Sequence, residues 1–167
     1  MVRMDPARRP VWTSMANLFL DTDTRLHYAF IARVAAASPY SLEELERIFL
    51  TEVAPVLEYN LLDIAGEWAM FRDEYVIESV ESRLAGNPEP YEMRTDVVKC
   101  WRQVAHLVGC LRALPEEERL GRSRLWDDLK MMFLDKDPKQ AKGLDTVDPA
   151  LLAHVLAKDM APAYGWG

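Results

Sequence analysis

The chain has 167 residues, a length typical of one globular domain. Half of the residues are apolar and 28% are charged, which excludes collagen-like, disulfide-scaffold and disordered classes. The 20 basic and 27 acidic residues give a net charge of −7, so the phosphates of a nucleic acid would be repelled on average. We therefore expect a folded acidic protein that does not bind nucleic acid.

The sequence also argues against export and membrane insertion. No run approaches the roughly 18 apolar residues that a membrane-spanning helix needs, and residues 1–10 contain arginines but no apolar stretch of the kind found in signal peptides. Cys100 and Cys110 fall within one helical pattern, which separates them by ~15 Å and prevents a disulfide within that helix. We therefore expect reduced thiols and a cytoplasmic location.

Apolar residues recur at steps of three and four along nearly the whole chain, and glycine is scarce, which predicts an all-α protein. We expect residues 1–167 to form a single-domain bundle of about six to eight helices without significant β-sheet. Helices are predicted over residues 11–20 and 25–37. A third begins at Ser41, where Ser41-Leu42-Glu43-Glu44 has the form of a capping box. Pro55 should kink or restart this helix, because proline lacks a backbone donor.

The helical pattern then continues through residues 59–64 to Gly66, which we expect to supply a left-handed C-terminal cap. Trp68, Met70 and Phe71 suggest a compact aromatic turn. Further helices are predicted over residues 73–84, 93–114, 120–134 and 149–157, with a loop at 86–90.

Two segments near the end of the chain stand out. Residues 135–147 are polar, contain Pro138 and Gly143, and are long for a connection within a compact domain, so we expect them to be mobile or functional. The last residues are apolar for a chain end, and Tyr164 and Trp166 there are expected either to pack on the core or to anchor a partner.

No motif for a metal, a cofactor or covalent catalysis is evident. His27, His106 and His154 are isolated from one another, and none is preceded three residues earlier by the glutamate of a di-iron bundle. The sequence also lacks a glycine-rich phosphate loop and a G-x-S-x-G nucleophile elbow. We therefore expect neither a cofactor nor a metal site, and no catalytic residues.

The distribution of charge is more informative. Residues 41–92 contain 13 acidic residues and three arginines, a net charge of −10, whereas the rest of the chain carries +3. Glu74, Glu78 and Glu81 are spaced to share one helical face, where like charges destabilise a helix. Such a face is either an ordinary solvated surface or the complement of a basic partner. On the second interpretation, these three residues together with Glu43 and Glu46 would bind the partner.

Two alternatives stay open. Glu52, Asn60, Asp63 and Glu67, beside Trp68, are candidates for the site of a small enzyme or a metabolite-binding protein, because paired carboxylates can exchange protons. Asp63 and Glu67 would meet on one face if the helix continued through them. The other alternative is a self-associating regulatory or structural protein, which would expose an apolar patch.

Several residues carry a family resemblance: Trp12, residues 18–22, Glu52-Val53-Ala54-Pro55-Val56-Leu57-Glu58-Tyr59-Asn60-Leu61 and Ala65-Gly66-Glu67-Trp68-Ala69-Met70-Phe71. Over residues 10–84 the chain resembles a family of small, uncharacterised bacterial all-helical proteins with a domain of unknown function. The resemblance implies no catalytic residue. Small acidic helical proteins of this type are often immunity proteins that neutralise a cognate toxin. We therefore expect a binding protein of this kind, with a basic toxin as its partner, rather than an enzyme.

Overall fold

The computed structural model describes residues 4–22, 24–67 and 69–113, and this part of the chain is helical without a β-strand. The all-α fold class predicted from the apolar periodicity is thus confirmed. In chain order the elements are α1 (Arg8–Met15), η1 (Ala16–Phe19), η2 (Thr24–His27), α2 (Tyr28–Ala37), α3 (Leu42–Ile48), η3 (Phe49–Val53), α4 (Ala54–Leu57), α5 (Tyr59–Leu62), α6 (Asp73–Ala85) and α7 (Val98–Arg112).

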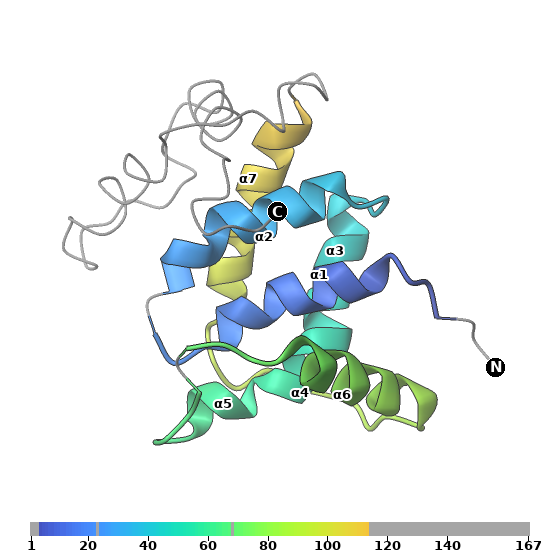
Figure 1. Cartoon of the computed structure of the whole chain (residues 1–167), viewed down its shortest axis with the longest axis vertical. Helices are drawn as coiled ribbons and strands as arrows, with labels where there is room; N and C mark the ends of the chain where they lie inside the picture. Colours follow the sequence, from blue (N-terminus) through green and yellow to red (C-terminus); the bar gives the residue numbers. More distant parts are fainter. Residues whose placement is uncertain (1–3, 23, 68, 114–167) are drawn as a thin grey trace.

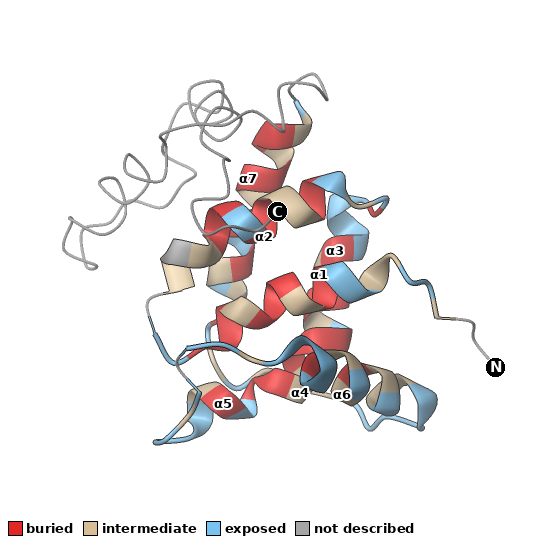
Figure 2. Ribbon diagram, viewed as in Figure 1, coloured by how far each residue is buried: buried red, intermediate tan, exposed pale blue. Residues whose placement is uncertain are grey.

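The described helices surround a cluster of buried apolar side chains. Figure 1 shows α2 crossing α7, with α1 beside α2 and α6 at one end of the bundle. The continuous stretch α3–η3–α4 lies behind α1, and η3 contacts both α1 and α6. Figure 2 shows that the buried residues face this interior, whereas much of α6 is exposed. The bundle therefore presents α6 to solvent along most of its length.

An aromatic column runs through the core. The rings of Phe19 and Phe49 stack with centroids 5.4 Å apart, and Phe49 stacks on Trp101 at 5.6 Å. All three side chains are fully buried. Because aromatic pairs contribute about 0.5–1.5 kcal/mol each beyond the area they bury, this column joins η1, η3 and α7 more firmly than apolar burial alone would.

The predicted capping box is confirmed at the start of α3. The Ser41 hydroxyl accepts the backbone N–H of Glu44 at 3.1 Å, and the Glu44 carboxylate accepts the N–H of Ser41 at 2.8 Å. The hydrogen bond that the Glu44 carboxylate accepts from the Ser41 N–H is the main cause that holds the pKa of Glu44 below its ordinary value. The reciprocal bonds satisfy donors that the first turn of a helix leaves without partners.

The disruption predicted at Pro55 is also confirmed, and it takes the form of a π-helical turn. Pro55 has no backbone N–H to donate into the preceding turn, and the helix widens just before it in η3. There the N–H of Ala54 bonds to the carbonyl of Phe49, five residues back. The wider turn directs Glu52 into the interior.

Several predicted boundaries are wrong. The helix predicted over residues 11–20 already begins at Arg8 and tightens into the 3₁₀ turn η1, and the one predicted over 25–37 starts as the 3₁₀ turn η2. The helix predicted over 93–114 begins only at Val98. Its first five predicted residues follow another path because Glu58 binds the backbone N–H groups of Arg94 and Thr95.

Gly66 is not a helix cap. The helix before it, α5, ends at Leu62, and Asp63 adopts an extended conformation. Glycine is required at position 66 for a different reason, because a Cβ there would lie 2.3 Å from the carbonyl oxygen of Asn60. Met70 and Phe71 lie in a segment without regular structure that leads into α6, so the compact aromatic turn predicted for them does not form.

Some predictions lie outside the described residues. These are the helices at 120–134 and 149–157, the polar segment 135–147, and the tail with Tyr164 and Trp166. Among the described residues, no helix is both long and apolar enough to cross a membrane. Cys100 and Cys110 both lie on α7, ten residues apart along the helix, and are not joined by a disulfide.

Candidate functional site

Helix α6 displays two of the predicted partner-binding carboxylates on its outer side. Val76 and Val80 bury the inner side of the helix against the core. Glu74 and Glu78 lie one turn apart from each other on the outer side, and both are exposed. Within the described residues, neither carboxylate has a cationic side chain within ion-pair distance. Their charges are therefore available to a partner.

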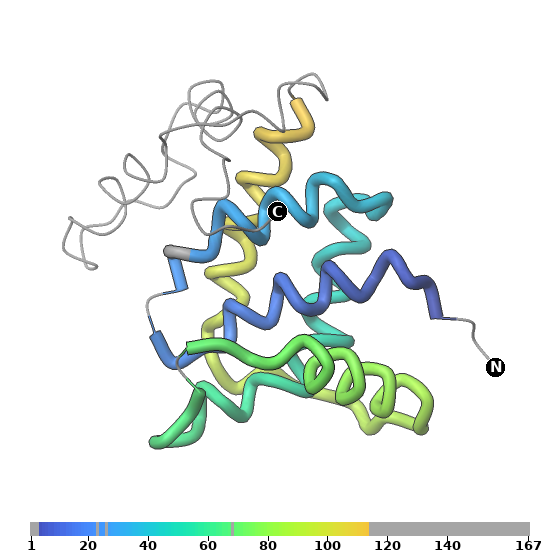
Figure 3. Tube along the Cα trace, viewed as in Figure 1, coloured from blue at the N-terminus to red at the C-terminus, as the bar shows by residue number. Residues whose placement is uncertain are grey.

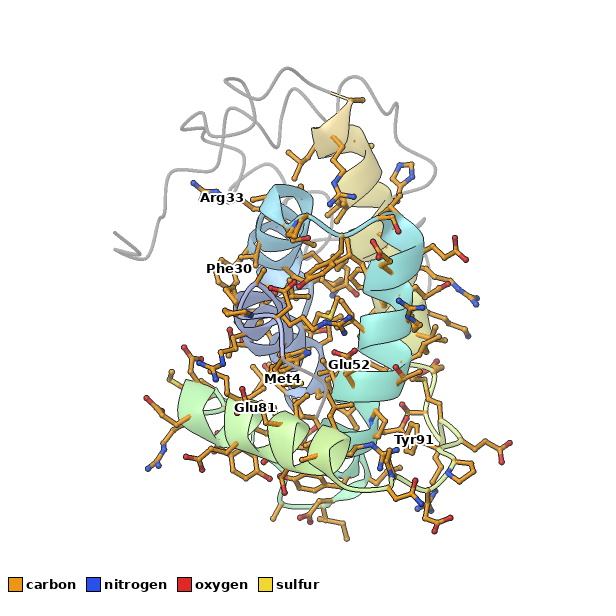
Figure 4. All side chains as sticks on the ribbon, turned by 90° about the vertical axis from the view of Figure 1, so that its right-hand side faces the viewer. Met4, Phe30, Arg33, Glu52, Glu81 and Tyr91 are labelled. Atoms are coloured by element: carbon orange, nitrogen blue, oxygen red, sulfur yellow. The ribbon has the colours of Figure 1, made fainter. Side chains whose placement is uncertain are left out.

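Glu81 behaves differently from the other two. Its carboxylate forms an ion pair with the guanidinium of Arg9, with Oε1 2.8 Å from Nη2 and 2.9 Å from Nε. Figure 4 shows Glu81 on the side of α6 that faces α1, the helix that carries Arg9. The ion pair holds α6 against α1. Because Arg9 neutralises its charge, Glu81 contributes less to the negative charge of the acidic face than its helical spacing predicted.

The other predicted pair, Glu43 and Glu46, lies on α3. With Glu44, Arg47, Leu50 and Thr51 these residues line a shallow hollow of about 510 Å³. Helix α3 packs against α7, whereas α6 packs against α1 and η3, and Figures 1 and 4 show the two helices apart. The five predicted carboxylates therefore do not form one continuous face, and α6 and α3 carry separate acidic groups.

Glu52, a candidate for the alternative enzyme site, is a buried structural carboxylate. It is 8% exposed, and its Oε2 accepts the indole N–H of Trp12 at 2.7 Å. The other oxygen is paired with the guanidinium of Arg8. Figure 4 shows Glu52 pointing into the space between its own helix and α1. A buried carboxylate needs such partners, and here they join η3 to α1.

Asn60, a second candidate for that site, bonds only to backbone. Its amide nitrogen donates to the carbonyls of Phe19 and Glu67, both at 2.8 Å, and its oxygen accepts the N–H of Glu67 at 2.7 Å. The carbonyl of Glu67 also accepts the N–H of Asp21 at 2.9 Å. Asn60 thus clamps the segment after α5 to the end of η1, which explains the close approach of Gly66.

Asp63 and Glu67 do not form the predicted carboxylate pair on a helical face. Both lie beyond the end of α5, and both are exposed. The Asp63 side chain accepts the N–H of Ala65 at 3.1 Å, and the Glu67 side chain accepts the N–H of Ala69 at 2.9 Å. Trp68, which was expected beside them, lies outside the described residues. These two hydrogen bonds, each to the N–H two residues ahead, are those of turn-forming residues.

The sequence reasoning missed Glu58, the most extensively bonded carboxylate among the described residues. It is 2% exposed and accepts the hydroxyl of Tyr91, the N–H groups of Arg94 and Thr95 at 2.9 and 3.0 Å, and the hydroxyl of Thr95 at 2.6 Å. Burial alone would raise the pKa of Glu58, but the hydrogen bonds outweigh it and lower this pKa. Burial and the same carboxylate raise the pKa of Tyr91. Glu58 therefore fixes the chain entering α7.

A second feature is a set of exposed apolar side chains, which the sequence reasoning did not identify by residue. Five large side chains between the start of α5 and the first turn of α6 are exposed, and we call them the tyrosine patch: Tyr59, Leu62, Ile64, Met70 and Tyr75. The hydroxyls of Tyr59 and Tyr75 are hydrogen-bonded at 2.8 Å, and this bond is the main cause that raises the pKa of Tyr59 to about 12. Periodicity could not reveal the patch, because an apolar residue reads as buried in a sequence pattern.

The histidines and cysteines form no metal centre within the part of the chain that the structure describes. His106 and Cys110 are neighbours on α7, with Nε2 and Sγ 3.7 Å apart. Burial raises the pKa of the Cys110 thiol and so disfavours its nucleophilic thiolate form. Burial also lowers the pKa of His27. His154 lies outside the described residues.

The fold and these surfaces define a small all-α protein with exposed carboxylates and exposed apolar side chains. The chain belongs to the family described as a domain of unknown function, DUF7079, whose model matches residues 6–108. The match includes residues 10–84, over which the resemblance to an uncharacterised family was seen in the sequence. No curated protein and no solved structure matches the chain. The family description indicates no reaction.

Proposed function

We propose that the protein acts by binding a basic protein, and that it is an immunity protein that neutralises a cognate toxin in the bacterial cytoplasm. The observation that carries the proposal is the pair of exposed carboxylates on α6, Glu74 and Glu78, which lack a cationic partner among the described residues. Like charges one turn apart cost helix stability. When a basic partner binds, its positive charges would attract both carboxylates and offset the repulsion between them.

The composition of the surrounding chain supports the same proposal. The segment 41–92 carries a net charge of −10, and complementary potentials of this kind accelerate association and reject partners of the wrong charge. Rapid association matters to a protein that must intercept a toxin. The alternative enzyme site also favours the binding proposal indirectly. The side chains of Glu52 and Asn60 are used in hydrogen bonds that stabilise the fold.

Affinity capture with charge-reversed variants tests the proposal. The tagged full chain and the variant Glu74→Lys/Glu78→Lys would be incubated with lysate of the source organism at low salt, and the retained proteins identified by mass spectrometry. We expect the wild type to retain one basic protein in stoichiometric amount and the variant to lose it. The purified partner should be toxic when expressed alone, and the wild-type chain should relieve this toxicity.

Two further variants complete the design. Glu89→Lys/Glu92→Lys makes the same charge change at exposed positions outside α6, so it should retain the partner. Glu43→Lys/Glu46→Lys makes the change on α3 and shows whether the second acidic group contributes. Equal retention by the wild type and the α6 variant, or no stoichiometric basic partner, would contradict the proposal.

A further inference from the structure

The tyrosine patch is unusual for the surface of this protein. Ile64 is 102% exposed, Met70 61%, and Tyr59, Leu62 and Tyr75 between 41% and 49%. Only two other large apolar side chains among the described residues, Phe30 and Leu42, are exposed by the same criterion. Single exposed apolar residues are common, but five of them within residues 59–75, two of which are joined by a hydrogen bond, are the kind of cluster found at binding surfaces.

The backbone and the tyrosine end of the patch are held in place by contacts with the fold. Figure 3 shows that the segment between α5 and α6 projects at one corner of the molecule and then runs back to the start of α6. Two hydrogen bonds between Asn60 and Glu67 fix the middle of this segment, and a third joins Asn60 to the carbonyl of Phe19. At its end the ring of Phe71 stacks on Tyr75 with centroids 6.4 Å apart, and Tyr75 bonds to Tyr59. A surface ordered before binding loses less entropy when a partner docks.

Acidic residues are interspersed along the chain with these apolar side chains. Residues 59–78 contain five acidic residues and one basic residue, Arg72, a net charge of −4. Asp63 lies between Leu62 and Ile64, and Asp73 and Glu74 directly precede Tyr75 in the first turn of α6. An apolar centre with a charged rim is the usual organisation of a protein-binding site, and tyrosine and methionine are enriched at such centres.

We propose that the tyrosine patch is the docking site for an apolar segment of the basic partner, with lysine or arginine side chains flanking that segment and facing the carboxylates of α6. This inference rests on the proposed function and specifies its partner chemistry. A second copy of the chain fits less well. A two-fold symmetric interface would bring the same acidic rim of both copies together, and like charges facing each other oppose association.

Two peptides serve as probes in a ¹⁵N nuclear magnetic resonance titration of the full chain. One is a helix-forming peptide of about 14 residues with leucines on one face and lysines on the other, and its control is oligolysine of equal charge. We expect the amphipathic peptide to bind about tenfold more tightly than oligolysine. Its chemical shift changes should be centred on residues 59–78.

Substitution of the patch separates apolar docking from attraction by charge. Leu62→Ser/Ile64→Ser should weaken binding of the amphipathic peptide about tenfold and leave oligolysine binding unchanged. Leu42→Ser is the matched control, because Leu42 is exposed to nearly the same extent as Leu62, 40% against 45%, but lies on α3. It should leave both peptides unaffected.

Three results would overturn the inference. If both peptides bind equally tightly to α6 and the serine variant is unchanged, attraction by charge alone operates, and the proposed function survives without apolar docking. If neither peptide shifts residues 59–78, the inference and the acidic binding face both fail. Concentration-dependent dimerisation without peptide, abolished by Leu62→Ser/Ile64→Ser in sedimentation velocity, would make a second copy the occupant.

Discussion

Replacing Glu58 by glutamine should weaken the main polar link between the end of α4 and the segment that enters α7. Glu58 precedes α5, and its carboxylate accepts hydrogen bonds from Tyr91, Arg94 and Thr95 in the segment that enters α7. The side chain is 2% exposed, so water does not replace a lost partner. The change keeps the size of the side chain and alters only its charge and bonding.

The expected loss of stability follows from the four bonds. Glutamine has one acceptor oxygen, and its NH₂ group would face two of the four donors. The hydroxyl of Tyr91 or Thr95 can rotate to accept, but one backbone N–H is left buried without an acceptor, at a cost of about 1–3 kcal/mol. The remaining bonds lose their charge assistance, which adds about 1 kcal/mol. We therefore expect a destabilisation of about 3 kcal/mol, and a Tm lower by about 6–12 °C.

Urea unfolding of the full chain, followed by circular dichroism, measures this loss. The midpoint should fall and the slope m should stay constant. Glu78→Gln makes the same chemical change at an exposed carboxylate on α6 and should alter stability by less than about 0.5 kcal/mol. A Glu58→Gln variant as stable as Glu78→Gln would refute the structural role assigned to Glu58.

The pH dependence of stability provides a second test of the same contacts. Because the pKa of Glu58 is lower in the folded than in the unfolded protein, the unfolded state binds more protons near pH 4. The stability that Glu58 contributes is present above its ordinary pKa of 4.5 and is lost as the pH falls through the folded value. The stability difference between wild type and Glu58→Gln should therefore shrink below pH 4.5. A difference that stays constant down to pH 3 would contradict the assignment.

Three other substitutions test the contacts that position the surface. Gly66→Ala places a Cβ 2.3 Å from the Asn60 carbonyl and should destabilise by about 2 kcal/mol, whereas a neutral result would disprove the close approach. Trp12→Phe leaves the buried Glu52 carboxylate without its indole donor and should cost about 1–3 kcal/mol in urea unfolding. Arg112→Met removes a side chain that donates to four carbonyls at and beyond the end of α2, and should lower the Tm measurably.

The local rules of the sequence predicted the elements well where neighbouring residues decide the structure. The Ser41 capping box, the interruption at Pro55 and the helix from Asp73 all depend on residues within one or two turns. The start of α7 could not be predicted in this way. It is set by Glu58, more than 30 residues earlier in the chain. The periodicity of apolar residues reflects neighbouring residues only and cannot predict a contact at that distance.

The candidate site was predicted only in part, for the same physical reason. Helical spacing correctly placed Glu74 and Glu78 on an outer face, but it could not show that Glu81 pairs with Arg9, 72 residues away. It also gave no information on the relative position of α3 and α6, which have different neighbours. The tyrosine patch depends on how the chain after α5 is held by Asn60, which only the tertiary structure reveals.

The rate of association between the chain and its captured partner tests the central claim most directly. We predict that the association rate constant falls about tenfold or more when the salt concentration is raised, and by a similar factor at low salt in Glu74→Lys/Glu78→Lys but not in Glu89→Lys/Glu92→Lys. An association rate that responds neither to salt nor to reversal of the α6 carboxylates would contradict the account of α6 as the surface that attracts a basic protein.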